Sequence, residues 1–412
     1  MISRRSAAQL LAGTAIASTL GGGAARAADD KVLRIGLNFS LTGGDAESAM
    51  RMRDGALMAI DEANAKKLIK GYKIEAVVLD DATATAGQYD PAQAATNARK
   101  FVSDRTVVGA VGPQMSGAGK AMAPILSMGG LAIITPSSTN PDLTDPKFAA
   151  QYRPGGKPIY FRTVTTDAFQ GPNMAEYFAG KLKVKKIFIL DDQGAYGIGM
   201  ADAFQKRIAT RGVEVLGRDQ LDPKVADYSA ILTKIKSLGA DSLYYGGVGS
   251  AGVKLIKQSY EILPDIKKGG GDGLVGADML KGAGFPACQG WYATIASPHM
   301  VEDPKMAAWI ASFKKKYNEA PEDYTITAYD AAVIVLESIK KVADSGKPVT
   351  RELVRDAIQS GKFDTLQGPI TYDEHGDIKD KIVSVFQIQK NDKAPLDDVS
   401  QQYHYIGVAP TS

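Results

Sequence analysis

The sequence predicts an α/β fold of two lobes, each a doubly wound parallel sheet with helices on both faces. Short apolar runs without polar alternation, such as 107–111 and 186–190, are typical of strands buried on both faces. These runs alternate with segments whose apolar residues recur at helical spacing, which is the pattern of βα units. The chain has 412 residues. Because one domain usually holds about 100–200 residues, we expect two domains.

The first 27 residues have the features of an export signal peptide. Met1–Arg5 is basic, 7–20 is weakly apolar and too short to span a bilayer, and Ala25–Ala27 fits a cleavage site. Ser3–Arg5 resembles the start of a twin-arginine signal, but the phenylalanine and lysine that usually follow are missing. We therefore expect a periplasmic protein, with the export route left open. No later stretch is long and apolar enough for a membrane helix.

Charge and composition argue against several classes of partner. Removal of residues 1–27 takes away three arginines and no acid, which leaves 46 basic and 46 acidic residues. A nucleic-acid binder would show a basic excess, so no nucleic-acid partner is expected. The single Cys288 and three scattered histidines lack the spacing of metal ligands. We expect neither a metal nor another cofactor.

The first series of elements follows the expected export signal. Asp90-Pro91 is typical of a helix start, with a cap followed by proline in the first turn. The breaks at Gly112-Pro113 and Gly129-Gly130 separate strand, helix and strand again. In order, we expect strand 32–39, helix 55–65, strand 73–79, helix 90–103, strand 107–111, helix 118–128 and strand 131–134.

A second series with the same rhythm begins near residue 161. We expect strands at 186–190, 213–218, 242–246 and 291–296, with helices at 197–211, 228–238 and 250–260. Helices at 304–317, 325–343 and 351–359 follow, and 368–389 changes to short alternating strands. The Gly- and Pro-rich segments 153–158 and 267–271 are predicted to be surface loops.

Hydroxyl-bearing loops follow two neighbouring strands of the first series. Ser116 opens a helix after strand 107–111, and Ser137, Ser138 and Thr139 follow strand 131–134. A crossover helix between parallel strands places both loops at the carboxyl edge of the sheet, where open α/β sheets bind ligands. Hydroxyls and helix-start N–H groups suit a carboxylate. The alternative is that these residues only cap helices and turns.

The sequence lacks the common motifs of enzymes. The dinucleotide fingerprint, the phosphate-binding loop and the nucleophile elbow are all absent. Gly117–Lys120 lacks the residue spacing of a phosphate-binding loop. Asp80-Asp81 and Asp191-Asp192 are neighbours at strand ends and point to opposite faces, so they do not form a general acid/base pair. We predict that the protein is not an enzyme.

Several short motifs occur along the chain in a fixed order. They are Ile35-Gly36 with Leu41–Gly43, Asp80-Asp81, Val111–Pro113 with Ser116, Thr135–Pro141 (TPSSTNP), Gln170–Pro172, Asp191–Gly197 (DDQGAYG), Tyr244–Gly247 and Gly368–Asp377 (GPITYDEHGD). Each is weak alone. Their joint order and spacing resemble the periplasmic branched-chain amino acid-binding proteins of the leucine/isoleucine/valine type, which serve ATP-driven importers. The resemblance covers nearly the whole mature chain.

The resemblance implies a type I periplasmic binding protein, with two lobes joined by a three-crossing hinge and a ligand held between them. The crossings would lie near 161–166, 297–300 and 367–368. Lobe 1 would comprise 31–165 and 299–366, and lobe 2 would comprise 166–298 and 367–410. The implied partners are a small-molecule ligand and the membrane permease of an ABC importer, and we expect a monomer.

The resemblance also implies roles for single residues. The α-carboxylate of an amino acid would bind at positions matching Ser116, Ser137 and Thr139, and its ammonium at Asp278 of lobe 2. Asp278 follows a short apolar run, so it could point into the cleft, or it could cap a helix or turn instead. Tyr196 matches an aromatic residue that lines the cleft of the family.

Two departures from the family leave the ligand open. Val248 stands where the family has an ammonium-binding tyrosine, and Ser48 stands near the site of a missing aromatic residue. Arg51 and Arg53 lie near the cleft rim, where they meet either an acidic ligand or solvent. We expect an amino acid ligand, branched-chain or similar. The alternatives are an aromatic or aliphatic carboxylate without an amino group, or a ligand-sensing receptor on the same fold.

Overall fold

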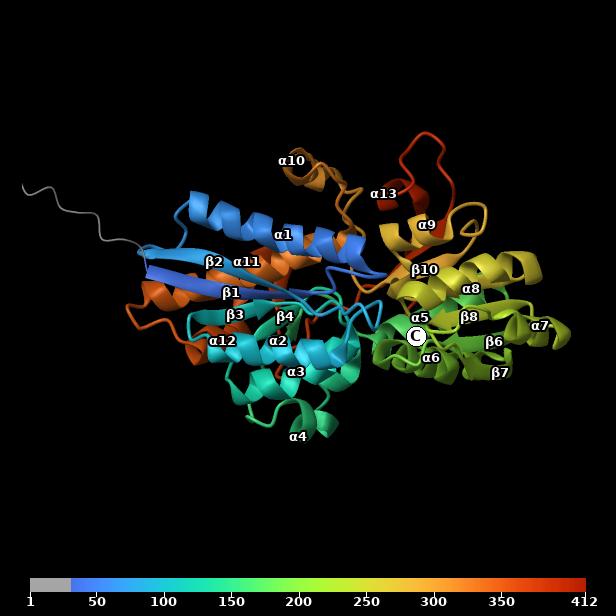
Figure 1. The fold of residues 1–412 in the computed structure, drawn as a ribbon, viewed down its shortest axis with the longest axis horizontal. Coiled ribbons are helices and arrows are strands. Elements are labelled where there is room, and N and C mark those ends of the chain that lie inside the picture. Colours follow the sequence, from blue (N-terminus) through green and yellow to red (C-terminus); the bar gives the residue numbers. More distant parts are fainter. Residues whose placement is uncertain (1–30) are drawn as a thin grey trace, which may run out of the picture.

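The computed structural model describes residues 31–412 and has two lobes that lie side by side (Figure 1). Each lobe has its own sheet with helices on both faces, so the predicted α/β fold of two lobes is confirmed. The predicted signal peptide, 1–27, lies outside the described residues. None of the helices within 31–412 combines the length and the apolar character that crossing a membrane requires.

Lobe 1 is built on a parallel sheet in the order β2-β1-β3-β4-β5. Its strands are β1 (Lys31–Phe39), β2 (Tyr72–Asp80), β3 (Val107–Val111), β4 (Ile133–Thr135) and β5 (Tyr160–Arg162). Val107 packs in the core on one face of this sheet and Val108 in the core on the other. This two-sided burial explains why β3 has no polar alternation.

The helices of lobe 1 cover both faces of its sheet. One face carries α1 (Ala46–Ala65), α11 (Asp323–Asp344) and α12 (Arg351–Ser360), and the other carries α2 (Pro91–Ser103) and α3 (Ser116–Met128). The short α4 (Ala149–Tyr152) and the peripheral α10 (Ala307–Tyr317) complete the lobe. As predicted, Asp90 caps α2 and accepts the N–H of Ala92 at 2.8 Å.

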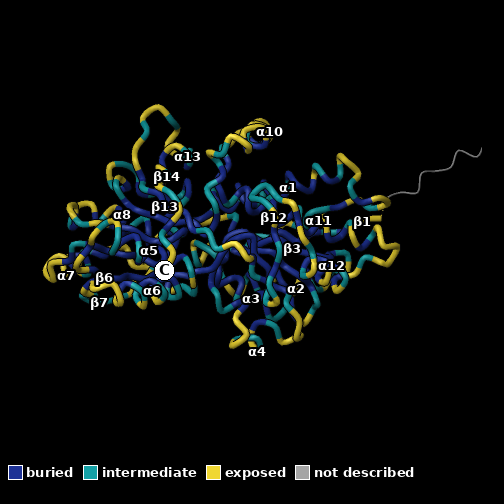
Figure 2. The backbone as a smooth tube through the Cα atoms, turned by 180° about the vertical axis from the view of Figure 1, so that it is seen from behind, coloured by how far each residue is buried: buried dark blue, intermediate teal, exposed yellow. Residues whose placement is uncertain are grey.

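Lobe 2 repeats the strand order of lobe 1 and adds two antiparallel strands. The sheet order is β14-β13-β10-β9-β8-β6-β7, with β13 antiparallel to β10 and β14 antiparallel to β13. Its strands are β6 (Lys186–Asp191), β7 (Glu214–Gln220), β8 (Ser242–Gly246), β9 (Lys267–Gly270), β10 (Tyr292–Ile295), β13 (Ser384–Ile388) and β14 (Tyr403–Val408). Figure 2 shows inner strands such as β6 and β13 buried and the outer loops exposed, whereas the edge strands β7 and β14 are mostly half-buried or exposed.

Helices also lie on both faces of the second sheet. One face carries α5 (Asp167–Tyr177) and α6 (Ala195–Ile208), and the other carries α7 (Ser229–Ser237), α8 (Gly249–Ile262) and α9 (Ala277–Ala283). The short α13 (Val399–Gln402) leads into β14. The carboxyl ends of the parallel strands in the two lobes face the region between them (Figure 1).

The prediction of a surface loop at 267–271 is wrong. Residues 267–270 form β9, which pairs with β8 and β10 inside the sheet. Glycine is needed there because of close packing: a side chain at Gly270 would come within 2.4 Å of the Tyr245 carbonyl oxygen. The glycines that indicated a loop therefore reflect close contact between neighbouring elements.

Helix α1 starts nine residues before the predicted start at Gly55. The additional turns bury Ala49 and Met52, while Arg51 is buried in an ion pair with Glu322. The arginines and the acids in this stretch concealed the helical pattern. Since the pairing partner comes from a distant part of the chain, no local signal revealed it.

The third crossing between the lobes lies further along the chain than 367–368. Residues 368–371 form β12, which pairs with β11 (Lys362–Thr365), and Ile370, Tyr372 and Ile378 pack in the core of lobe 1. The chain then reaches lobe 2 before β13. The other two crossings lie between β5 and α5 and after β10.

Candidate ligand-binding site

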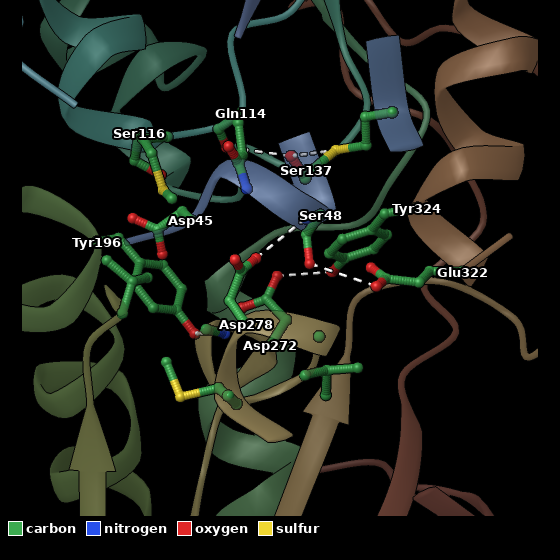
Figure 3. Close-up of a pocket in the computed structure, with 17 residues that line it drawn as sticks. Asp45, Ser48, Gln114, Ser116, Ser137, Tyr196, Asp272, Asp278, Glu322 and Tyr324 are labelled. Carbon is green, nitrogen blue, oxygen red and sulfur yellow. Dashed lines mark hydrogen bonds between the residues drawn. The ribbon is translucent and has the colours of Figure 1, made fainter. Parts of the chain in front are cut away.

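A cavity of about 60 Å³ lies between the two lobes (Figure 3). Lobe 1 contributes Asp45, Ser48, Met52, Gln114, Met115, Ser116, Ser137, Glu322 and Tyr324. Lobe 2 contributes Tyr196, Val248, Asp272, Gly273, Val275, Gly276, Asp278 and Met279.

Two of the predicted hydroxyl residues line this cavity. Ser116 starts α3, and its hydroxyl accepts the Asn140 N–H at 3.2 Å. The Ser137 hydroxyl lies 3.1 Å from the Gln114 carbonyl oxygen. The two loops therefore hold each other in place at the carboxyl edge of the sheet, where the sequence placed them.

Ser138 and Thr139 are buried but do not line the cavity. The Ser138 hydroxyl accepts a hydrogen bond from the Tyr160 hydroxyl at 2.9 Å, so it supports the loop from behind. The Thr139 carbonyl oxygen accepts the N–H of Asp167 at 3.0 Å, at the first crossing between the lobes. In this structure, both residues link the site to its scaffold.

Asp278 lies in the cavity wall of lobe 2 and contacts lobe 1. Its Oδ1 accepts the backbone N–H of Glu47 at 3.1 Å, and its Oδ2 accepts that of Ser48 at 3.0 Å. These N–H groups belong to the first turn of α1, which has no partner within its own helix for them. Asp278 therefore caps α1 across the cleft (Figure 3). Its predicted contact with an ammonium stays a prediction.

Ser48 and Glu322 lie at a contact between the two lobes. The Ser48 hydroxyl lies 3.4 Å from Glu322 Oε1, which also pairs with Arg51 at 3.3 Å and accepts the Ala277 N–H at 3.2 Å. A side chain at Gly276 would come within 2.4 Å of the Ser48 hydroxyl. A larger residue would therefore displace the Ser48 hydroxyl, and the φ of +155° at Gly276 also favours glycine.

Tyr196 and Val248 form part of the lobe 2 wall. The Tyr196 hydroxyl accepts the N–H of Gly273 at 3.2 Å, which fixes the turn before α9. The N–H of Val248 donates to Asp192 Oδ2 at 2.9 Å, and Val248 lines the cavity. Both residues lie where the sequence analysis expected them, and their contact with a ligand is untested.

Asp272, which the sequence analysis missed, also lines the cavity. Its Oδ2 accepts the Tyr324 hydroxyl at 2.6 Å and its Oδ1 accepts the Gln170 amide at 3.2 Å. The residue follows β9 directly, so it lies at the carboxyl end of a parallel strand, where ligand contacts concentrate. Recognition of β9 as a strand would have identified it.

Asp45 is the second acid that the sequence analysis missed. It precedes α1 and lies against Gly249 at the start of α8, which belongs to lobe 2. Its side chain is 6% exposed, and Oδ2 has no hydrogen-bond partner among residues 31–412. An aspartate before a helix is a strong start signal, so the sequence did contain an indication at this position.

Residues 32–393 match the periplasmic binding protein family. The chain belongs to this family. The resemblance found in the sequence is thereby confirmed, and the members of the family bind substrates for transporters.

Relatives of this periplasmic binding protein span nearly its full length. The leucine-, isoleucine-, valine-, threonine- and alanine-binding protein of Pseudomonas aeruginosa is 31% identical over 360 residues, 87% of this chain and 90% of that protein. The branched-chain amino acid transporter substrate-binding protein of Streptococcus pneumoniae, solved with isoleucine, has a TM-score of 0.76 at 25% identity, covering 92% and 100% of the two chains.

A third comparison shows the same fold with another kind of ligand. A solute-binding protein of an ABC transporter from R. palustris, solved in complex with benzoate, has a TM-score of 0.76. It is 20% identical, and the match covers 92% of this chain and 97% of that chain. At this identity the match concerns the architecture alone.

The cavity of this periplasmic binding protein is acidic. Asp45, Asp272, Asp278 and Glu322 line it, and none of the described residues that line it is lysine, arginine or histidine. Arg51 and Arg53 lie outside the lining, paired with acids. Neither arginine therefore belongs to the cavity lining.

Burial changes the acidity of these carboxyl groups. It raises the pKa of Asp45 to about 7, reinforced by the charges of Asp278, Asp192 and Asp81. It also raises the pKa of Glu322 to about 7, against the effect of Arg51, and raises the pKa of Asp278 and Asp272. A desolvated carboxyl group is most readily ionised when a positive charge comes close. Among residues 31–412, no three or more histidine, cysteine or acidic side chains are grouped to hold a metal ion.

Proposed function

We propose that this protein binds an amino acid in the cleft between its lobes and delivers it to the membrane permease of an ABC importer. The proposal rests on one observation, the presence of both hydroxyl groups and acids in the cavity lining. Ser116 and Ser137 lie at the carboxyl edge of the lobe 1 sheet, and four carboxyl groups line the same cavity. A zwitterion satisfies both sides, because its carboxylate needs donors and its ammonium needs acceptors.

The acidity of the lining disfavours a carboxylate that has no amino group. A benzoate-type ligand would bring a negative charge into a cavity with four carboxyl groups and no lysine, arginine or histidine among its described lining residues. Like charges at short range in a desolvated site are costly. Val248 and the methionines Met52 and Met279 supply an apolar surface for the side group of an amino acid.

Delivery to a permease would follow hinge closure, the usual motion of two-lobed binding proteins. In this proposal the ligand docks first on lobe 1 at Ser116 and Ser137. Lobe 2 then closes, and Asp278 caps α1 across the cleft as it does in this structure. We further propose that the protein acts as a monomer and reaches the periplasm through the signal at 1–27, by the general or the twin-arginine route.

A thermal-shift panel followed by calorimetry tests the proposal. The purified protein is unfolded and refolded to remove any bound ligand, and then is heated with each common L-amino acid, benzoate and 4-hydroxybenzoate. We expect one or more amino acids to raise the melting temperature and the benzoates to have no effect. Stabilisation by the benzoates alone would overturn the proposal.

A further inference from the structure

The helix that should be capped by Asp45 is capped from the other lobe. Aspartate is among the preferred residues at a helix N-cap, where its side chain accepts N–H groups of the first turn. Asp45 occupies this position before α1, yet its side chain accepts no such bond within the described structure. The N–H groups of Glu47 and Ser48 bind Asp278 instead.

Because Asp278 caps α1 in place of Asp45, one carboxylate oxygen of Asp45 lacks a hydrogen-bond donor. Asp278 and Asp272 each have both carboxylate oxygens hydrogen-bonded, and Glu322 pairs with Arg51. Asp45 Oδ2 is buried and accepts no hydrogen bond of good geometry among residues 31–412, although the backbone N–H of Gly249 lies close to this carboxyl group. A buried polar atom in this state lowers stability, and more so when it is charged. The structure therefore has a strong acceptor in the cavity wall that still needs a donor (Figure 3).

The cations nearest to the cleft are engaged elsewhere. Arg51 pairs with Glu322, and Lys281 pairs with Glu47 and Asp397 at the rim. Neither residue lines the cavity. The Oε1 atom of Gln114, another cavity residue, is also buried without a donor in the described part of the chain. Two acceptors that lack donors therefore lie in one small cavity.

We infer that Asp45 Oδ2 binds the protonated amine of the ligand, and that Asp278 serves the closed form by capping α1. The inference rests on the proposed function and assigns the ammonium contact to a residue of lobe 1. An amine supplies the missing N–H donor and the compensating charge at once. Because Asp278 of lobe 2 caps α1, the Asp45 side chain is available to bind the ligand. Closure of the lobes and recognition of the ligand therefore both occur at the N-terminus of α1.

The decisive variant is Asp45→Asn, which keeps the size and removes the charge. The matched control is Asp54→Asn, which removes an acid from the same helix at a position outside the cavity, where Asp54 pairs with Arg53. The probe is the L-amino acid that raises the wild-type melting temperature most, compared with the same molecule without its amino group. Calorimetry gives the affinities, and thermal melting of the ligand-free proteins reports folding.

We expect Asp45→Asn to weaken binding of the amino acid about ten- to hundredfold, which is the effect of losing one charge-assisted hydrogen bond. The control should bind like the wild type, and the des-amino probe should bind both proteins equally. The ligand-free melting temperature of Asp45→Asn should not fall, because an unpaired buried charge has been removed.

Failure of the inference is distinguishable from failure of the proposed function. If Asp45→Asn binds the amino acid as well as the wild type does, or loses both probes equally, or melts lower without ligand, the Asp45 contact is wrong while amino acid binding stands. If the wild type binds no amino acid, the proposed function itself is wrong and the inference falls with it.

Discussion

Asp278 and Ser48 face each other across the cleft, with Oδ2 of Asp278 accepting the backbone N–H of Ser48 at 3.0 Å. The two residues lie 230 positions apart in the chain and belong to different lobes. The contact joins a carboxylate to a helix N-terminus, where the helix dipole favours negative charge. Because opening of the hinge would separate the two residues, this contact stabilises the closed form specifically.

Replacement of Asp278 by alanine should therefore weaken closure. We expect about a tenfold loss of affinity for the amino acid ligand, the effect of losing a charge-assisted cap of about 1–2 kcal/mol. Calorimetry measures the affinity, and small-angle scattering with saturating ligand should show a larger radius of gyration than in the wild type.

The same variant separates two roles of Asp278. If it acts through closure, the amino acid and its des-amino analogue lose affinity by similar factors. If Asp278 contacts the ammonium directly, as the family resemblance implies, only the amino acid loses affinity. An unchanged affinity for both molecules would exclude both roles.

A weaker, salt-dependent contribution to closure is expected from the rim. Lys281 of lobe 2 pairs with Glu47 of lobe 1 at 2.8 Å, and its side chain is 43% exposed. Exposed ion pairs contribute about 0–1 kcal/mol and are screened by salt. Lys281→Met should reduce ligand affinity by less than about fivefold at low salt, and the difference from the wild type should vanish at about 1 M salt. A large loss that persists at high salt would contradict this.

The loop that carries Ser137 depends on a buried arginine. Arg162 donates to the carbonyl oxygens of Ser138 and Asn140, and it pairs with Asp377 just before the third crossing. Its side chain is fully buried, so its loss leaves several groups without partners. Arg162→Met should lower the free energy of unfolding by at least about 3 kcal/mol.

Urea unfolding of the whole two-lobed protein measures this loss of stability. Arg34→Met is the matched control, because Arg34 in β1 pairs with Glu75 and Asp104 and its side chain is 34% exposed. That change should cost less than about 1 kcal/mol. Equal losses in the two variants would show that burial of Arg162 has no special role.

The architecture was predictable from the sequence because it depends on local patterns. The apolar run of β3 and the capped start of α2 are short-range signals, and the structure has them as expected. The strand β9 escaped detection because its glycines follow from contacts with Tyr245 and Tyr292 in neighbouring strands. The third crossing escaped because β12 pairs with β11 and keeps its chain segment in lobe 1.

The candidate site was predictable only in part, for a related reason. Ser116 and Ser137 follow strands that the pattern revealed, so their position at the sheet edge could be derived. The environment of Asp278 could not be derived from the sequence, because its partners Glu47 and Ser48 come from the other lobe. Asp45 was missed because α1 was expected to begin later, which hid both the cap position and the exchange of caps.

The stability of the ligand-free protein and its affinity for ligand should both depend on pH through Asp45. Its pKa is raised to about 7 in the structure, by burial and then by the charges of Asp278, Asp192 and Asp81. An acid with a raised pKa holds its proton more tightly in the folded state. The free energy of unfolding of the ligand-free protein should thus fall as pH rises from about 4 to about 7. The acids Asp81 and Asp192, each with a pKa raised to about 6, add to the same trend.

Ligand affinity should follow the opposite course. The ammonium binds the ionised form of Asp45, so affinity should be full above about pH 7 and fall, at most about tenfold per pH unit, below it. Calorimetry at about pH 5.5 and about pH 8, in two buffers with different heats of ionisation, measures both the affinity and the proton released on binding. Asp45→Asn should abolish this release, whereas a release that persists in the variant would assign the titration to another carboxyl group, such as Glu322, whose pKa is also raised to about 7.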